Sequence, residues 1–201
     1  PQEVGHGYED KTRKLNLPAG NKLKWHFIAP NVHDFSWAAD PEYIHDQITA
    51  ENGVVLHFLY KNNPDTNENW KKLQPHTAEL LSYYNKQIGQ YPYKQYSVIQ
   101  AGDGGMEYGM CTFITGGKNY KGLFGVTAHE FAHSWFQFVL ATNELKHAWM
   151  DEGFTEYFTN RAQNEILKEN NTHPQEGMYS AYYSLVKSGK EQPQALHADK
   201  F

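Results

Sequence analysis

The sequence predicts an α+β fold, because strand-like segments come mostly first along the chain and helical segments follow. Segments rich in β-branched and aromatic residues predict three strands, at residues 53–62, 95–101 and 106–115. Apolar residues at helical spacing predict four helices, at residues 69–89, 125–140, 151–170 and 174–187. Because strands and helices neither alternate regularly nor repeat, this order disfavours a doubly wound parallel sheet.

Composition is typical of an ordered globular protein. The 201 residues are enough to bury a core, as one domain or as two small ones. They include 14 Tyr, 11 Phe and 5 Trp, which is unlike a disordered chain. The net charge is −5, and acidic and basic residues are well mixed, which argues against nucleic acid or an anionic membrane as a partner.

Cellular location is not fixed by the sequence. Cys111 is the only cysteine, so no internal disulfide can form, yet this does not exclude a periplasmic protein. The first ten residues have neither a basic nor an apolar signal region, and we expect no targeting segment in this chain. No stretch has the length and apolarity of a membrane span. The sequence is compatible with a periplasmic, secreted or cytoplasmic location, and it does not define an oligomeric state.

In the first half of the chain, strand-like pieces at residues 23–39 are interrupted at Pro30 and Asn31. The predicted strand 53–62 is followed by a polar loop and then by the helix at 69–89. Pro75 predicts a break or a fresh first turn in that helix. Its apolar positions recur at helical spacing: Trp70, Leu73, Leu80, Leu81, Tyr84 and Ile88.

In the second half, glycines mark the turns. Residues 102–105 turn the chain between two predicted strands, and the glycine-rich residues 116–122 precede the helix at 125–140. Asp151 is a candidate N-cap of the next helix. The apolar stripe of that helix is expected to consist of Phe154, Tyr157, Phe158, Ala162 and Ile166.

The segment His-Glu-Phe-Ala-His, residues 129–133, carries three ionisable side chains inside an otherwise apolar helix. Residues four apart on a helix differ by about 40° and rise about 6 Å, so His129 and His133 project from one face. Two imidazole nitrogens placed in this way can bind one zinc ion. Glu130 is rotated by about 100° from His129, which suits a base that takes a proton from a metal-bound water.

Chance is the alternative explanation of this motif, with core histidines satisfied by neighbours and a surface glutamate. Its weakness is the surrounding sequence, because a helix that is apolar nearly all round is buried. A buried carboxylate without a partner is costly or becomes neutral. A polar stripe beside the histidines needs partners that a dication would supply, and it consists of Thr127, Glu130, Ser134 and Gln137.

A catalytic zinc site usually has three protein ligands, so one more is expected. Eighteen residues separate His133 from Glu152, which leaves room for a turn and an antiparallel second helix. Glu152 is the candidate, although an acid in a first helical turn is also favoured by the helix dipole alone. Asp151 and His147 are competing ligands, and Asp151 also suits the cap position.

These spacings resemble a known family. The two histidines, the gap of eighteen residues and the glutamate inside Trp-Met-Asp-Glu-Gly-Phe-Thr-Glu-Tyr resemble the gluzincin zinc metallopeptidases. Upstream, Gly-Gly-Met-Glu-Tyr at residues 104–108 is similar to the Gly-x-Met-Glu-Asn signature of the aminopeptidase N family. Three ordered signatures are more specific than the histidine motif alone.

The resemblance implies a thermolysin-like catalytic domain at residues 41–201, with a small mixed or antiparallel sheet followed by zinc-binding helices. Residues 1–40 would be the end of an N-terminal β-domain. The resemblance also assigns one zinc ion to His129, His133 and Glu152. It makes Glu130 the general base that activates the zinc-bound water and then passes the proton to the leaving amine.

For the substrate, the resemblance implies a peptide with a free N-terminus. Glu107 would bind its α-amino group, because an anion near the metal selects a cationic N-terminus. Gly104, Gly105 and Met106 would lie along an edge strand where the peptide backbone docks. Without the histidine motif, the same glycine-rich segment would be explained as a flexible hairpin corner.

Two departures from the family pattern stand out. Tyr108 replaces the asparagine of the signature, and a ring cannot reproduce the hydrogen bonds of an amide. The family also uses a tyrosine as an oxyanion partner, and by family spacing it would fall beyond Phe201; Tyr179, Tyr182 and Tyr183 come too early. We therefore expect a catalytic-domain fragment that lacks the N- and C-terminal domains of its parent and has weak activity or none.

The leading functional hypothesis is a zinc-dependent aminopeptidase that removes the N-terminal residue of peptides. A second hypothesis keeps the metal chemistry without the free-amine requirement, as in an endopeptidase or in the epoxide hydrolase branch of the family. A third is a non-catalytic binding module with a structural zinc site. Glu130 separates catalysis from a structural role, and Glu107 separates exopeptidase from endopeptidase activity.

Overall fold

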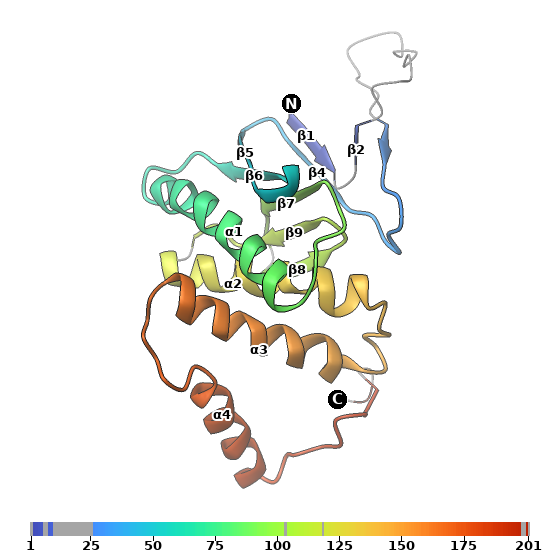
Figure 1. The fold of residues 1–201 in the computed structure, drawn as a ribbon, viewed down its shortest axis with the longest axis vertical. Coiled ribbons are helices and arrows are strands. Elements are labelled where there is room, and N and C mark those ends of the chain that lie inside the picture. Colours follow the sequence, from blue (N-terminus) through green and yellow to red (C-terminus); the bar gives the residue numbers. More distant parts are fainter. Residues whose placement is uncertain are drawn as a thin grey trace.

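The computed structural model describes residues 2–5, 8–9, 26–102, 104–117, 119–197 and 200. A mixed five-stranded sheet and four helices form the body of the molecule, which confirms the predicted α+β class (Figure 1). The helices are α1 (Asn67–Gln87), α2 (Tyr120–Ala132), α3 (Ala148–Ile166) and α4 (Glu176–Lys187). In Figure 1, α3 lies below the pair α1 and α2, and α4 stands apart at the bottom.

The sheet has the strand order β5-β6-β7-β9-β8. Its strands are β5 (Tyr43–Thr49), β6 (Val55–Lys61), β7 (Gln95–Gln100), β9 (Cys111–Ile114) and β8 (Gly105–Tyr108). The pairs β6–β7 and β7–β9 are parallel, whereas β5–β6 and β8–β9 are antiparallel. The single strand predicted at 106–115 is wrong, because residues 109–110 form a turn that divides it into β8 and β9. This turn makes β8 an edge strand of the described sheet.

Strand alternation directs one face of the sheet toward the helices. Leu56, Phe58 and Tyr60 of β6 are fully or almost fully buried there, and the Tyr60 ring stacks on Trp70 of α1 with centroids 5.0 Å apart. α2 is buried nearly all round, as its apolar composition predicts. The polar stripe on this helix is buried as well: Thr127, Glu130, Ser134 and Gln137 are each at most 6% exposed.

Three of the helices differ from the predictions. Pro75 lies inside α1 without ending it. The predicted helix 125–140 ends as an α-helix at Ala132, and the following segment η2 (Ser134–Val139) is kinked by non-helical dihedrals at Phe136 and Gln137. Within η2, Gln137 has φ 129° and ψ −65°, a region that favours glycine. On α3 the predicted stripe is only partly buried, because Phe154 is 42% exposed while Thr155 is fully buried.

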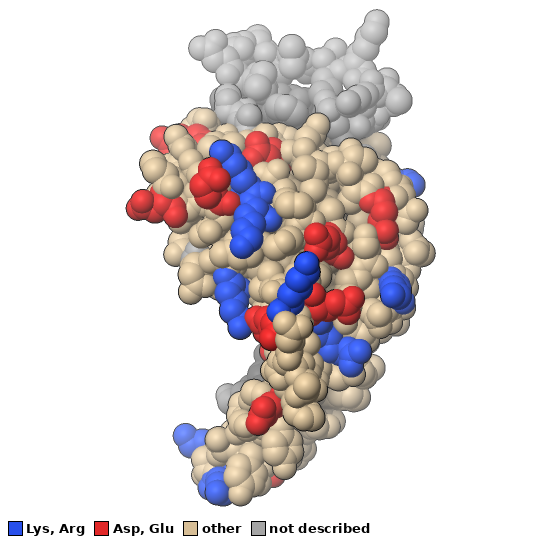
Figure 2. Space-filling view, turned by 60° about the vertical axis from the view of Figure 1, so that its left-hand side comes forward, with Lys and Arg blue, Asp and Glu red and all other residues tan. Residues whose placement is uncertain are grey.

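The remaining elements are small. β1 (Gln2–Gly5) pairs with β4 (Trp37–Asp40), β2 (Tyr8–Glu9) pairs with β3 (Phe27–Ile28), and η1 (Glu51–Gly53) precedes β6. The division predicted between residues 40 and 41 falls between β4 and β5, and two separate domains there stay a prediction. None of the helices within the described residues has the length and apolarity needed to cross a bilayer. On the face shown in Figure 2, acidic and basic side chains are interspersed.

We expect Tyr84→Phe to lower the free energy of unfolding by about 1 kcal/mol, since the buried Tyr84 hydroxyl donates to the Ala128 carbonyl of α2 at 2.8 Å. Urea unfolding followed by tryptophan fluorescence measures the change. Tyr179→Phe is the matched control, because Tyr179 is 71% exposed, and its midpoint should not move. Equal midpoints for both variants would show that this hydrogen bond does not stabilise the packing of α1 on α2.

Candidate metal centre

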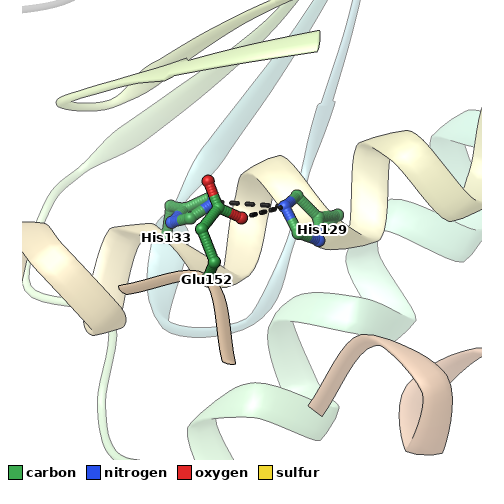
Figure 3. Close-up of side chains that lie close together, drawn as sticks. All are labelled: His129, His133 and Glu152. Atoms are coloured by element: carbon green, nitrogen blue, oxygen red, sulfur yellow. Dashed lines mark hydrogen bonds and ion pairs between the residues drawn. The ribbon is translucent and has the colours of Figure 1, made fainter. Parts of the chain in front are cut away.

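The two histidines of the motif project from one helical segment toward the same point. His129 lies in the last turn of α2, and His133 follows at its C-cap with helical dihedrals, φ −58° and ψ −20°. The helical path is therefore unbroken between the two residues, and their Nε2 atoms lie 3.2 Å apart (Figure 3). His133 is 1% exposed, whereas the His129 side chain is 23% exposed. The pair thus has one buried and one accessible member.

Glu152 reaches the same point from α3. Its Oε2 lies 3.1 Å from Nε2 of His129 and 3.7 Å from Nε2 of His133 (Figure 3). The donor atoms of these three residues all lie within 4.8 Å of one another. Two imidazole nitrogens and one carboxylate oxygen form the donor set of many catalytic zinc sites. The Glu152 side chain is 58% exposed, so the site is open to solvent on this side.

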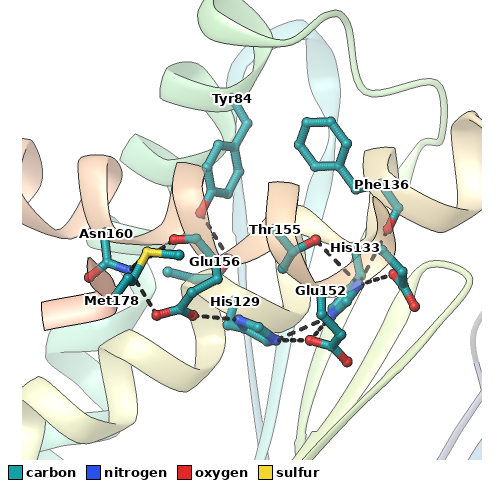
Figure 4. A network of polar contacts seen from close by, with 11 residues as sticks. Tyr84, His129, His133, Phe136, Glu152, Thr155, Glu156, Asn160 and Met178 are labelled. Carbon is teal, nitrogen blue, oxygen red and sulfur yellow. Dashed lines mark hydrogen bonds and ion pairs between the residues drawn. The ribbon is translucent and has the colours of Figure 1, made fainter. Parts of the chain in front are cut away.

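Further carboxylates hold the far nitrogens of both rings. Nδ1 of His129 lies 3.1 Å from Oε2 of Glu156, and Nδ1 of His133 lies 2.7 Å from Oδ1 of Asp151. Such contacts fix the tautomer and direct Nε2 toward a metal. Figure 4 shows the network of polar contacts that extends along α3 from Glu152 through Glu156 to Asn160. Asn160 donates to Oε1 of Glu156 at 2.7 Å and holds this carboxylate in place.

Asp151 does not cap α3, so that expectation is wrong. The helix begins at Ala148, three residues earlier than predicted, with His147 at the cap position and no side-chain cap. Asp151 therefore lies inside the first turn, 3% exposed, with its carboxylate on His133. The backbone carbonyl of Phe136 and the hydroxyl of Thr155 also approach Nδ1 of His133, each at 3.3 Å. The kinked segment η2 thus brings a further acceptor to this ring.

Hydrogen bonds to carboxylates favour the protonated form of both histidines. Burial acts to lower the pKa of His129, but hydrogen bonds to Glu152 and Glu156 outweigh it and raise the pKa to about 10. The same bonds lower the pKa of both glutamates. For His133, burial is outweighed by the bond to Asp151, which raises the pKa. A metal ion would have to displace these protons, so binding is linked to proton release.

Glu130 is a buried carboxylate beside the histidines. It is 6% exposed, and its Oε2 has no hydrogen-bond partner among the described residues. Burial raises its pKa to about 7, against the opposing effect of His129 and His133. A carboxylate without a partner is costly in the interior, and a nearby dication or a water that it binds would offset that cost. The residues present therefore fit a metal ion at this point.

Glu107 and Gly105 of the edge strand β8 face the same space. Donor atoms of Glu107, Glu130 and His133 lie within 4.8 Å of one another, and burial raises the pKa of Glu107. Gly105 has no room for a side chain, because an added Cβ would meet the Glu130 carboxylate and lie 2.7 Å from Val126 Cγ2. The backbone of β8 thus lies directly against the candidate base.

The other residues singled out in the sequence do not belong to the candidate metal centre. Gly104 is exposed at the start of β8, and Met106 is 41% exposed. Alternation places the Tyr108 ring on the opposite sheet face from Glu107, where it packs against Phe113 with centroids 5.2 Å apart. The Tyr108 ring therefore lies on the sheet face away from Glu107. His147 is exposed and belongs to neither metal-binding group found among the described residues.

The structure brings together His129, Glu130, His133, Glu152 and Glu107, the residues singled out in the sequence. It also shows that the carboxylates of Glu156 and Asp151 accept hydrogen bonds from the two imidazole rings. Glu156 follows Glu152 by four residues and so shares its helix face, a signal that was present in the sequence. The hydrogen bond of Asp151 to His133 depends on where α3 begins, which the local sequence did not reveal.

Comparisons with known proteins find relatives of this chain in sequence and in fold. The family description "Peptidase family M1 domain" matches residues 73–199, more than half of the chain. The chain is 28% identical over 132 residues to leucine aminopeptidase 2 of Emericella nidulans, covering 62% of the chain and 21% of that protein. It is 32% identical over 106 residues to leucine aminopeptidase 2 of Ajellomyces capsulatus, covering 49% of the chain and 17% of that protein.

Among solved structures, the fold is similar to an M1 zinc metallopeptidase from Deinococcus radiodurans, with a TM-score of 0.70 and 19% identity. A mutant of that enzyme bound to a Tyr-Ser-Ala substrate gives a TM-score of 0.69 at 17% identity. Each alignment covers 97% of this chain and 44% of the other. The chain therefore spans less than half of these structures and about a fifth of the curated relatives that it matches.

We expect Asp151→Ala to weaken zinc binding by about 10- to 100-fold, because His133 loses the carboxylate that orients its ring. Competition with a chromogenic chelator measures the affinity. Glu165→Ala is the control: Glu165 is an exposed acid on the same helix, and its removal should leave the affinity unchanged. Equal losses in both variants would show that only the net charge of α3 matters.

Proposed function

Because the chain belongs to peptidase family M1, we propose that it is the catalytic domain of a zinc-dependent aminopeptidase, which hydrolyses the N-terminal residue from peptides. The observation that carries the proposal is the convergence of His129, His133 and Glu152 beside the unpartnered carboxylate of Glu130. The names of the curated relatives, both leucine aminopeptidases, support the exopeptidase class.

One zinc ion would be held by His129, His133 and Glu152. When bound, zinc supplies a Lewis acid that polarises the scissile carbonyl and acidifies a water molecule. Glu156 and Asp151 would keep the two rings oriented for binding. The carboxylate of Glu152 is the most accessible of the three ligands, which leaves an approach for substrate on the solvent side.

Glu130 would move the proton. Its Oε2 has no partner among the described residues, so it is free to accept a proton from the attacking water. The pKa of about 7 is matched to this task near neutral pH, because such a carboxyl can both take a proton and release it. Glu130 would then hand the proton to the nitrogen of the leaving amine.

Glu107 would recognise the N-terminus of the peptide. Its carboxylate faces Glu130 and His133 from the edge strand β8, so a cationic α-amino group bound there lies next to the reacting centre. β8 has no strand neighbour on its outer side within the described sheet, and an extended peptide can pair with such an edge. Gly104, Gly105 and Met106 would contact the peptide backbone. These two features together support cleavage after the first residue.

We expect Glu130→Gln to lower kcat by about 10²- to 10⁴-fold while zinc content stays near one ion per chain, because the amide cannot accept the proton. Hydrolysis of aminoacyl reporter substrates and elemental mass spectrometry measure the two quantities. The measurements are made on this chain and on a longer protein that contains it. Glu165→Gln is the control and should retain both activity and zinc.

If Glu130→Gln retains turnover, the general-base assignment fails. If the unchanged chain binds no zinc, the proposed ligand set fails for this chain. Activity only in the longer protein, with zinc bound in both, supports the proposal and assigns the missing contribution to residues outside this chain.

We expect N-acetylation of the substrate to abolish cleavage, because it removes the positive charge that Glu107 would bind. Glu107→Gln should raise KM for free-amine substrates more than it lowers kcat, since the loss is in recognition of the amino group. Steady-state kinetics on matched free and acetylated peptides measure both effects. Equal cleavage of the two peptides would contradict the exopeptidase assignment and favour an endopeptidase.

A further inference from the structure

A second pair of histidines lies on the opposite face of the sheet from α2. His45 is on β5 and His57 on β6, where Leu59 is the register partner of His45 and Gln47 that of His57. The two histidines are therefore diagonal neighbours on one sheet face. Residues that alternate with them, Leu56 and Phe58, belong to the core under the helices. The histidine pair thus lies outside the candidate metal centre.

The two rings present nitrogens to each other at the separation of neighbouring metal ligands. Nε2 of His45 lies 2.9 Å from Nδ1 of His57, and the ring centroids are 5.2 Å apart. Two ligands at right angles around a metal, with bonds of about 2.0 Å, are separated by about 2.8 Å. The two rings are hydrogen-bonded to each other at 2.9 Å, which is close to this ligand spacing, so small ring rotations would let both nitrogens bind one ion.

The strands fix the pair in position. β6 is paired along its length with β5 on one side and with β7 on the other, so the backbone that carries His57 is held by two ladders. His45 is exposed, and the remaining coordination positions around a metal would be open to water. Gln47, exposed on the same face beside His57, offers an amide oxygen as a further donor.

We propose that His45 and His57 form a surface site for a divalent transition metal of square-planar preference, with Cu(II) bound most tightly. Imidazole suits copper and nickel, and copper stands highest in the order of stability for nitrogen donors. An ion bound there would lie on the opposite face of the sheet from the His129 and His133 pair, so occupation of one site leaves the ligands of the other untouched.

Copper titration tests the proposal. The unchanged chain and its variants are dialysed against a chelator and titrated with CuCl2 at pH 7 in the presence of glycine as a competing ligand. Copper binding is followed by electron paramagnetic resonance. We expect His45→Gln and His57→Gln each to bind about one copper fewer per chain than the unchanged protein. His173→Gln, an exposed histidine in the turn before α4, is the matched control and should lose none.

The result is the difference in copper bound per chain between the variants and the unchanged protein. It therefore does not depend on what binds at His129 and His133. Thermal melts establish that each variant is folded. A nitrogen-coupled component of the spectrum that is lost in both His45→Gln and His57→Gln, but kept in His173→Gln, supports the site. Unchanged copper uptake and spectrum in these folded variants would overturn it and leave a plain hydrogen bond between two neutral rings.

Discussion

α2 buries ionisable side chains, and the elements packed against it supply their partners. Glu130 and His133 lie in the interior on a helix that is apolar nearly all round. Such groups are stable there only if other elements bring partners of opposite charge or hydrogen-bonding capacity. α3 does so with carboxylates on both far nitrogens of the histidine pair. The contact between α2 and α3 is thus electrostatic as much as apolar, and its polar part coincides with the candidate metal centre.

The edge of the sheet supplies the other half of the site. Because β8 turns back antiparallel to β9, it ends the sheet directly above α2 and leaves its outer side unpaired among the described strands. Gly105 lets the strand approach until its backbone touches the Glu130 carboxylate. Glu107, two residues on, projects from the same face. One short strand therefore combines a surface for extended peptide backbone with an anion next to the reacting groups.

Local periodicity explains which features the sequence could predict. The pairing of His129 with His133 follows from helical geometry alone, and the α+β class follows from element order. Glu152 was found through spacing and family resemblance. The bond of Asp151 to His133 was missed because α3 begins at Ala148, a boundary that no side-chain cap marks. The kink within η2, after His133, was also missed, since the apolar pattern simply continues through it. Tertiary contacts determine both, and Gln137 in its glycine-like conformation is the local sign of them.

α4 differs from α1, α2 and α3 in how far its residues are buried. None of its twelve residues is buried, and a helix of this length is marginal in water without tertiary support. Its backbone amides should therefore exchange with solvent through local opening, whereas those of α1 exchange only when the core unfolds. The segment that joins α3 to α4 then becomes the natural point of proteolytic cleavage. A product that ends near Ile166 would still contain every residue of the candidate metal centre. Cleavage at this point would therefore shorten the chain and leave the centre intact.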